Sequence, residues 1–251
     1  TWIWAAHLIA AIRDFSMTGK GLLVWTHPGS QGWRPVGGFV LRGALMEVGI
    51  EHKSVYGAAE DPLEIDKIVS FCQAAHLKNE LNMSTAGALG GRGMGQTCGR
   101  ADPSQWMKVF GVDIDSRDTT EVLRIAKEMP SERISALEPR LKTLFGKLPE
   151  KNLVTEHSIR LYLAIKEFVE RERWDFYTIQ SFPGLAGDYA ATCFAQSMML
   201  EDGYGTSTLG DFITLLTVYL WTTLSPEPVD YGELQHIDKE SKEIKIIGDG
   251  A

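Results

Sequence analysis

The chain has 251 residues, of which 44% are hydrophobic and 23% charged; this composition is that of an ordinary globular protein and excludes an intrinsically disordered one. Its formal net charge is -8 at pH 7, so its surface repels phosphate backbones and nucleic-acid binding is not expected. The three cysteines, Cys72, Cys98 and Cys193, lack CxxC spacing, which argues against a disulfide framework or zinc knuckle and favours a cytoplasmic location.

The first twelve residues are strongly apolar, but the run ends at Arg13 and Asp14. It is too short to cross a bilayer. We therefore expect a buried helix here and no association with a membrane.

Residues 21–114 alternate strand-like apolar runs with amphipathic stretches, which is typical of an α/β fold with a parallel sheet wound with helices. Strands are expected at 22–25, 52–56, 85–89 and 112–114. We expect all four to share one sheet, with the loops that follow the first and third strands at the same carboxyl edge.

Helix ends between these strands are marked by capping residues. Asp61 and Asp102 each precede a proline, and Asp118 precedes Glu121 by three positions, so each aspartate is expected to cap a helix. Gly49 is the expected C-terminal glycine of the preceding helix.

Residues 146–152 form a polar stretch with glycine and proline, which we take as the domain boundary. It divides the chain into a first domain at 1–150 and a second at 151–251. A helix is expected before it, at 131–144; after it we expect a helix at 156–172, a strand at 176–181, helices at 189–200 and 211–223, and a β-hairpin over 234–247.

A glycine-rich loop, Gly90 to Gly95, directly follows the third expected strand. Its backbone amides are free of bulky side chains and could cradle an anion or a sugar hydroxyl, at the edge where such sheets bind ligands. It is not a dinucleotide fingerprint, because the third glycine would fall on Gln96. A purely structural turn is the other interpretation.

The loop at 25–33 carries Trp25, His27 and Trp33, which could stack on and hydrogen-bond a sugar. The simpler interpretation is two packing tryptophans and an ordinary loop histidine. The other histidines lack metal-ligand spacing, so core, surface or strand roles are expected for His7, His52, His76, His157 and His236.

Asp211 lies just before the apolar run 212–220, which places a carboxylate at the N-terminus of a helix. A helix cap is the default role of aspartate at this position. The alternative is that its carboxylate binds a ligand or transfers a proton.

Three stretches, in order, resemble the L-fucose/L-arabinose isomerase family. Residues 89–95 and 101–113 are similar to its glycine loop and its "ADPxQWxxxFGVD" segment. Residues 174–193 resemble the strand and helix that carry a catalytic glutamate in the family. Residues 210–238 resemble the region of its second metal-binding carboxylate.

The resemblance implies a flavodoxin-like middle domain and the start of a catalytic domain, in a longer, homohexameric protein. It also implies an aldose-ketose isomerase, in which two carboxylates and a histidine hold Mn²⁺ and a proton moves between C1 and C2 of a monosaccharide through an enediol. Asp211 falls on the position of a catalytic and metal-binding carboxylate. The sugar is expected to contact Gly91, Arg92, Gln180 and Asp188.

Position 184 departs from the family pattern, because Gly184 stands where the family carries its glutamate. Asp188 is the nearest substitute, and the family's metal-binding histidine lies beyond Ala251. A non-catalytic sugar-binding or structural relative is therefore the alternative function. A flavodoxin-like nucleotide or flavin binder ranks last, because a phosphate-binding motif is lacking. No motif identifies the sugar.

Overall fold

The structure is a computed structural model that describes residues 5–16, 20–29, 34–147, 150–227 and 229–248. The chain divides into two compact units, residues 1–81 and 82–251. Both contain parallel strands and helices, so the expected α/β class is confirmed. Within the described ranges, no helix is both long and apolar enough to cross a membrane.

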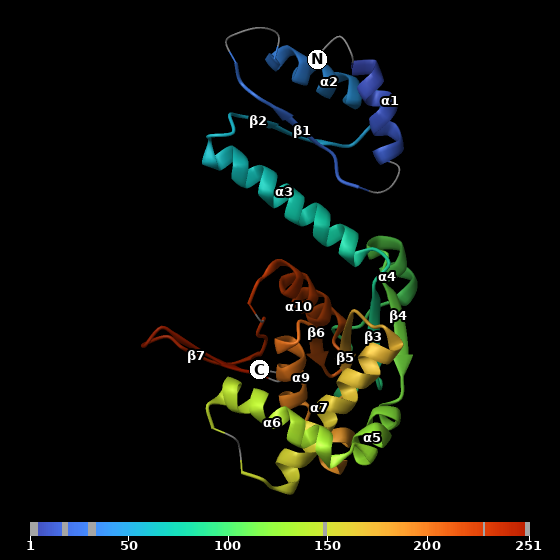
Figure 1. Ribbon diagram of the computed structural model, residues 1–251, viewed down its shortest axis with the longest axis vertical. Coiled ribbons are helices and arrows are strands. Elements are labelled where there is room, and N and C mark those ends of the chain that lie inside the picture. Colours follow the sequence, from blue (N-terminus) through green and yellow to red (C-terminus); the bar gives the residue numbers. More distant parts are fainter. Residues whose placement is uncertain (1–4, 17–19, 30–33, 148–149, 228, 249–251) are drawn as a thin grey trace. The chain divides into compact units, whose positions relative to one another are not determined.

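The first unit is built around a pair of parallel strands (Figure 1). Its elements are α1 (Ala5–Ser16), β1 (Leu23–Thr26), α2 (Arg34–Glu47), β2 (Lys53–Tyr56) and α3 (Pro62–Leu81). Gly38 lets α2 approach β1 closely, since a Cβ there would lie 2.1 Å from the hydroxyl oxygen of Thr26. The expectation of a buried N-terminal helix is wrong in one respect. Every side chain from Leu8 to Arg13 is exposed or half-buried, although α1 packs against α2.

The second unit holds a four-stranded parallel sheet in the order β4-β3-β5-β6. The strands are β3 (Thr85–Leu89), β4 (Asp113–Arg117), β5 (Phe176–Ile179) and β6 (Gly205–Thr208). The helices are η2 (Gly93–Gly95), α4 (Pro103–Phe110), α5 (Thr119–Glu128), α6 (Ser131–Phe145), α7 (Leu153–Glu172), α8 (Gly184–Asp188), α9 (Cys193–Glu201) and α10 (Phe212–Leu224).

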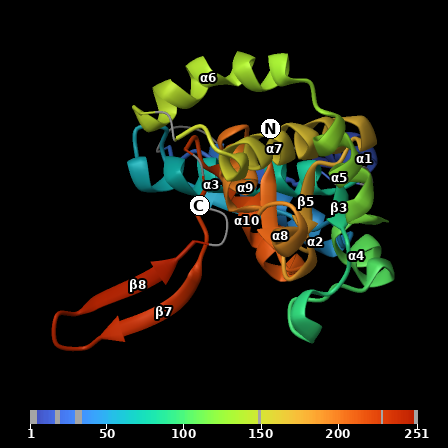
Figure 2. The same cartoon turned by 90° about the horizontal axis from the view of Figure 1, so that it is seen from below.

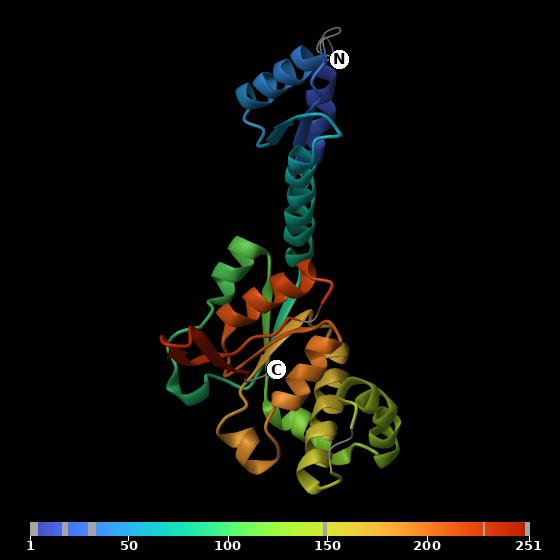
Figure 3. The same ribbon diagram turned by 90° about the vertical axis from the view of Figure 1, so that its left-hand side faces the viewer.

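Helices cover both faces of this sheet (Figure 3). On one face, Phe176 of β5 stacks on Tyr219 of α10, and Trp106 of α4 meets Phe212 edge to face. On the other face, α5, α7 and α9 form the larger core, with α6 packed outside α7. Tyr162, Phe168, Tyr177 and Met198 are fully buried there, so burial of apolar surface holds this unit together.

The four strands expected within residues 20–115 all form, but they do not share one sheet. β1 pairs with β2, whereas β3 pairs with β4 and β5. β3 accepts β5 because Gly87 leaves room for the ring of Trp174, which a Cβ at Gly87 would meet at 1.9 Å. The sheet therefore takes strands from both sides of residues 146–152, and that stretch lies inside the second unit.

The expected helix caps are confirmed. The carboxylates of Asp61, Asp102 and Asp118 accept hydrogen bonds from the backbone amides of the next helix at 3.1, 2.8 and 2.8 Å. Gly49 follows α2 with a φ of +71°, a left-handed conformation that suits glycine.

The expected hairpin is the two-stranded ribbon β7 (Glu233–Asp238) and β8 (Glu243–Ile247), which projects from the second unit (Figure 2). Its register shifts between Leu234 and His236. This bulge places four apolar side chains on one face, because Leu234 pairs with Ile246 and Ile237 pairs with Ile244. All four are 52 to 63% exposed.

The carboxylate of Asp202 links α6, α7 and α9. Asp202, at the end of α9, pairs with Arg140 of α6 at 2.6 Å and with Lys166 of α7 at 2.8 Å, and it accepts a hydrogen bond from the hydroxyl of Tyr162 at 2.6 Å. Burial alone would raise the pKa of Asp202, but hydrogen bonds from Lys166, Tyr162 and Arg140 outweigh it and hold the pKa below its ordinary value.

We predict that Asp202→Asn lowers the free energy of unfolding by about 1–3 kcal/mol, since it leaves two cations without their counter-charge. Because the folded pKa of Asp202 is lowered, its stabilisation is present above the unfolded pKa of about 3.9 and is lost as the pH falls further. Urea unfolding at pH 6 and pH 3 should show a smaller acid-induced loss in Asp202→Asn than in the unaltered chain. Asp188→Asn, at an exposed site, is the control; equal acid sensitivity in all three proteins would contradict the assignment.

Candidate functional site

The carboxyl ends of four parallel strands meet at one edge of the sheet in the second unit, which is where α/β sheets bind ligands. The glycine loop follows β3, Gln180 follows β5, and Asp211 lies three residues after β6. The structure therefore brings three of the expected site segments to one edge.

The glycine loop is held by backbone hydrogen bonds to its neighbours. Gly90, with a φ of +82°, donates its amide to the carbonyl of Arg117 at 2.8 Å, and Gly93 donates to the carbonyl of Leu209 at 3.1 Å. The amide of Gly91 donates to Oε1 of Gln180 at 2.8 Å. Gly91 and Gln180 are thus adjacent, and this bond uses the Gly91 amide and the Gln180 oxygen.

The segment after the glycine loop packs directly on Asp211. Arg100 donates to the carbonyl of Gly210 at 2.9 Å, and the amide of Phe212 donates to the carbonyl of Gly99 at 2.7 Å. Gly99 has a φ of +69°, and a Cβ there would lie 2.4 Å from Oδ1 of Asp211. Glycine at position 99 is therefore required on both conformational and steric grounds.

Asp211 is half-buried and caps α10, as the simpler interpretation predicted. Oδ1 accepts the amides of Ile213 and Thr214, both at 3.0 Å, and Oδ2 accepts the Thr214 hydroxyl at 2.8 Å. A carboxylate has about four acceptor sites. Three are used here, so capping leaves one for a ligand.

Position 184 and Asp188 lie on α8, the short helix after β5. Both residues are exposed, and a Cβ at Gly184 would meet no atom within 4 Å. Among the described residues, the Asp188 carboxylate has no hydrogen-bond or ion-pair partner, and the same holds for the exposed Arg92 side chain. Neither side chain lines the cavity that contains Asp211.

A cavity of about 130 Å³ adjoins Asp211. Its lining combines the end of β6, the start of α10 and the base of the ribbon: Gln96, Ser207, Thr208, Leu209, Asp211, Thr214, Tyr231, Gly232 and Glu233. Sequence reasoning missed Thr208 and Glu233. The signal available was their position, because Thr208 ends a strand and Glu233 lies in a stretch that resembles the isomerase family.

The described residues do not fit a resident Mn²⁺ ion. Within them, no group of three or more histidine, cysteine, aspartate or glutamate side chains could hold a metal. Asp211 and Glu233 share the cavity, but three acceptor sites of Asp211 are already used by its own helix. We therefore assign no chemical step to a metal.

Two histidines of the second unit, His157 and His236, have the structural roles expected of them. His157 stacks on Tyr189 with ring centroids 4.1 Å apart, and its Nδ1 lies 3.2 Å from the carbonyl oxygen of Tyr189. His236 is a strand residue of the ribbon, as expected. His27 is exposed and belongs to the first unit, while residues 30–33 of its loop, with Trp33, fall outside the described residues.

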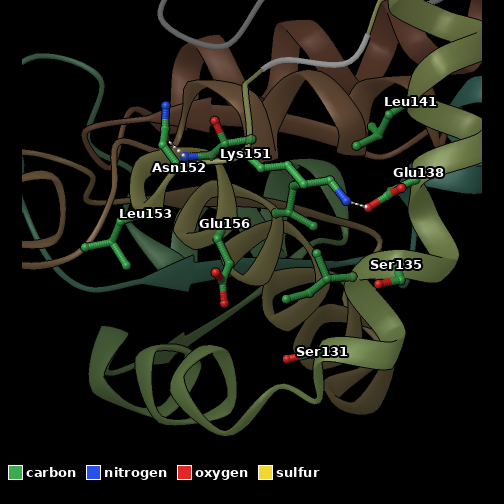
Figure 4. Close-up of a pocket in the computed structure, with 11 residues that line it drawn as sticks. Ser131, Ser135, Glu138, Leu141, Lys151, Asn152, Leu153 and Glu156 are labelled. Atoms are coloured by element: carbon green, nitrogen blue, oxygen red, sulfur yellow. Dashed lines mark hydrogen bonds and ion pairs between the residues drawn. The ribbon is translucent and has the colours of Figure 1, made fainter.

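A larger cavity of about 440 Å³ lies between α6 and the start of α7 (Figure 4). It is formed by the outer helices, away from the strand ends, and none of the expected site residues lines it. Its charges are paired internally, with Lys151 pointing toward Glu138 at 2.6 Å and Glu156 bound to Arg160 at 2.7 Å. Its polar groups, such as the hydroxyls of Ser131 and Ser135, are exposed and lie on the outer helices, away from the strand ends.

We predict that Gly99→Ala disrupts the junction with Asp211 and destabilises the second unit more than Gly95→Ala does. Both glycines have a positive φ, so both variants carry a conformational cost of about 1–2 kcal/mol. A Cβ meets Asp211 at position 99 but open space at position 95, so Gly99→Ala should cost at least about 1 kcal/mol more. If both variants lose the same free energy of unfolding in chemical denaturation, the contact between position 99 and Asp211 does not constrain the fold.

Comparison with known proteins shows a likeness to a sugar isomerase. Over 194 residues, the chain is 24% identical to a sulfoquinovose isomerase of Clostridium sp. (strain MSTE9). The match covers 76% of this chain and 43% of that protein, so the chain spans less than half the length of this curated relative. No protein-family model matches the chain.

Proposed function

We propose that this chain is part of a sugar isomerase that interconverts an aldose and a ketose. The observation that carries the proposal is the likeness to a sulfoquinovose isomerase over 76% of the chain. At 24% identity, this likeness supports the isomerase class rather than a particular sugar. The motifs at 89–113 and 210–238 independently resemble another sugar-isomerase family.

The chemistry needs acid-base groups that move one proton between two adjacent carbons of the sugar and another between their oxygen atoms. A carboxylate near the end of a buried strand suits this work, and we propose Asp211 as one of these groups. Its hydrogen bonds to α10 fix its position, and its remaining acceptor site is available to a substrate.

The finer assignments are part of the same proposal. An isomerase of the L-fucose/L-arabinose type, acting as a homohexamer with Mn²⁺, rests on the sequence resemblance, and the metal would need ligands beyond those described. Of the proposed sugar contacts, Arg92 and Asp188 have exposed side chains without a partner among the described residues, whereas the Gly91 amide and Oε1 of Gln180 already bind each other.

A non-catalytic sugar-binding relative is favoured by one observation. Position 184 lacks a side chain, and Asp188 does not line the Asp211 cavity. If Asp211 is only a cap, none of the site residues expected from the sequence supplies an acid or base to this cavity. Activity measurements separate the two functions.

We predict that the intact enzyme converts an aldose to a ketose, and that Asp211→Asn lowers kcat by about 10²-fold or more through loss of an acid or base. Asparagine retains capping ability, so the free energy of unfolding should change by less than about 1 kcal/mol. NMR of product formation, with sulfoquinovose tested first among a panel of aldoses, measures the effect. Asp118→Asn is the matched control, since Asp118 caps α5 outside the cavity. If Asp211→Asn leaves kcat unchanged, Asp211 is a helix cap and not a catalytic group.

We predict that Gly184→Glu folds normally and raises kcat. The site is exposed and sterically open, so stability should change by less than about 1 kcal/mol. Gly187→Glu is the control, because Gly187 lies on the same short helix and is equally open. A gain shared by both variants, or seen in neither, would argue against a degraded carboxylate site at position 184.

A further inference from the structure

The polar groups that line the Asp211 cavity differ in whether they are already used. The Ser207 hydroxyl donates to the Asp211 carbonyl at 2.6 Å and lies 2.8 Å from the Thr178 hydroxyl, so it is already used. The side chains of Gln96, Thr208 and Glu233, by contrast, have no hydrogen-bond partner among the residues that the structure describes. Three free polar groups therefore surround one small space.

Thr208 is the most informative of the three. It is only 6% exposed, yet its hydroxyl lines the cavity without a partner in the described chain. Thr206, two residues earlier on the same face of β6, is by contrast contacted by Nε2 of Gln196 at 3.5 Å. Because this hydroxyl faces the cavity and keeps its donor and acceptor sites, it can hydrogen-bond to whatever occupies that space, water or a polar ligand.

The backbone of Glu233, which lines the cavity, is held by contacts of its neighbours and by its own strand pairing. Before it, the Tyr231 hydroxyl accepts a hydrogen bond from Gln196 at 3.1 Å. Gly232 lets the base of the ribbon close, since a Cβ there would lie 2.5 Å from the carbonyl oxygen of Ile247. Glu233 itself pairs with Ile247 across the ribbon. These constraints fix the backbone of Glu233 and leave its carboxylate free.

We propose that this cavity binds the carbonyl end of a polyhydroxylated ligand, with Gln96 and Thr208 on its oxygen atoms and Glu233 as the proton-transfer carboxylate that position 184 lacks. The ligand class rests on the proposed isomerase function. A volume of about 130 Å³ is well above the ~10–15 Å³ that one water molecule needs, so the space has room for the end of a small polyhydroxylated ligand.

The proton transfer balances within the substrate. The carboxylate of Glu233 takes the proton from the carbon next to the carbonyl, and that C–H electron pair becomes the carbon–carbon double bond of an enediol. The carbonyl π pair moves to its oxygen, which takes the hydroxyl proton of the neighbouring carbon. Glu233 then returns its proton to the former carbonyl carbon, where the electron pair of the double bond forms the new C–H bond. The electron pair left on the deprotonated oxygen forms the new carbonyl at the neighbouring carbon, so no outside oxidant or reductant is needed.

Binding is tested with xylitol, a linear polyol without a carbonyl group, by saturation-transfer NMR and titration of the full chain. We expect saturable binding that Thr208→Val weakens by about fivefold or more and Thr208→Ser retains, since serine keeps the hydroxyl. Thr217→Val is the control, because the Thr217 hydroxyl binds the Ile213 carbonyl outside this cavity. Absence of binding, or equal binding by all variants, would mean that the cavity holds only water.

Proton transfer is tested in the intact enzyme. Glu233→Gln should lower isomerase kcat by about 10²-fold or more while xylitol affinity changes by less than about threefold, and Glu243→Gln on β8 should change neither. Full isomerase activity in Glu233→Gln would overturn the role of Glu233 and leave the proposed function standing. Thr208-dependent xylitol binding without isomerase activity on any aldose would keep the binding site but overturn both the proton-transfer role and the proposed function.

Discussion

The architecture of the second unit depends on one aromatic ring in the space that a glycine leaves. Trp174 packs against Gly87 of β3, and its indole nitrogen donates to Asp115 of β4 at 3.0 Å. The next residue, Asp175, exchanges hydrogen bonds with Thr85: its carboxylate accepts the Thr85 amide at 2.7 Å and its amide donates to the Thr85 carbonyl at 3.0 Å. These contacts fix β5 beside β3 in a single register, and a side chain at position 87 would displace the ring.

The β3–β5 pairing decides what lies at the carboxyl edge. Because β5 and β6 follow β3 in the sheet, the glycine loop, Gln180 and Asp211 emerge from neighbouring strands, although about 120 residues separate the first from the last. Close backbone approach then completes the site. A Cβ at Gly210 would lie 2.6 Å from the carbonyl oxygen of Gly91, so the two loops touch only because glycine stands there.

Features set by local chemistry could be predicted from the sequence, and features set by distant pairing could not. The caps at Asp61, Asp102 and Asp118 follow from neighbouring residues, and all of them form. The pairing of β3 with β5 depends on the contact between Trp174 and Gly87, and the hydrophobic periodicity of the sequence does not predict a contact between such distant residues. β6 was missed because Gly205–Thr208 is a short run without large apolar residues, although all four of its residues are buried. Thr208 and Glu233 share a cavity only after folding.

The position of Glu233 in the candidate site depends on the ribbon. Glu233 begins a two-stranded hairpin, and isolated hairpins of this size are only marginally stable in water. Its apolar face, formed by Leu234, Ile237, Ile244 and Ile246, is more than half exposed in the described structure. Packing against this face would stabilise the ribbon and therefore the position of the Glu233 carboxylate. Asp211, by contrast, is fixed by its own helix. The two carboxylates of the cavity thus differ in what holds them, because Asp211 is set by local capping and Glu233 by the pairing at the base of the ribbon.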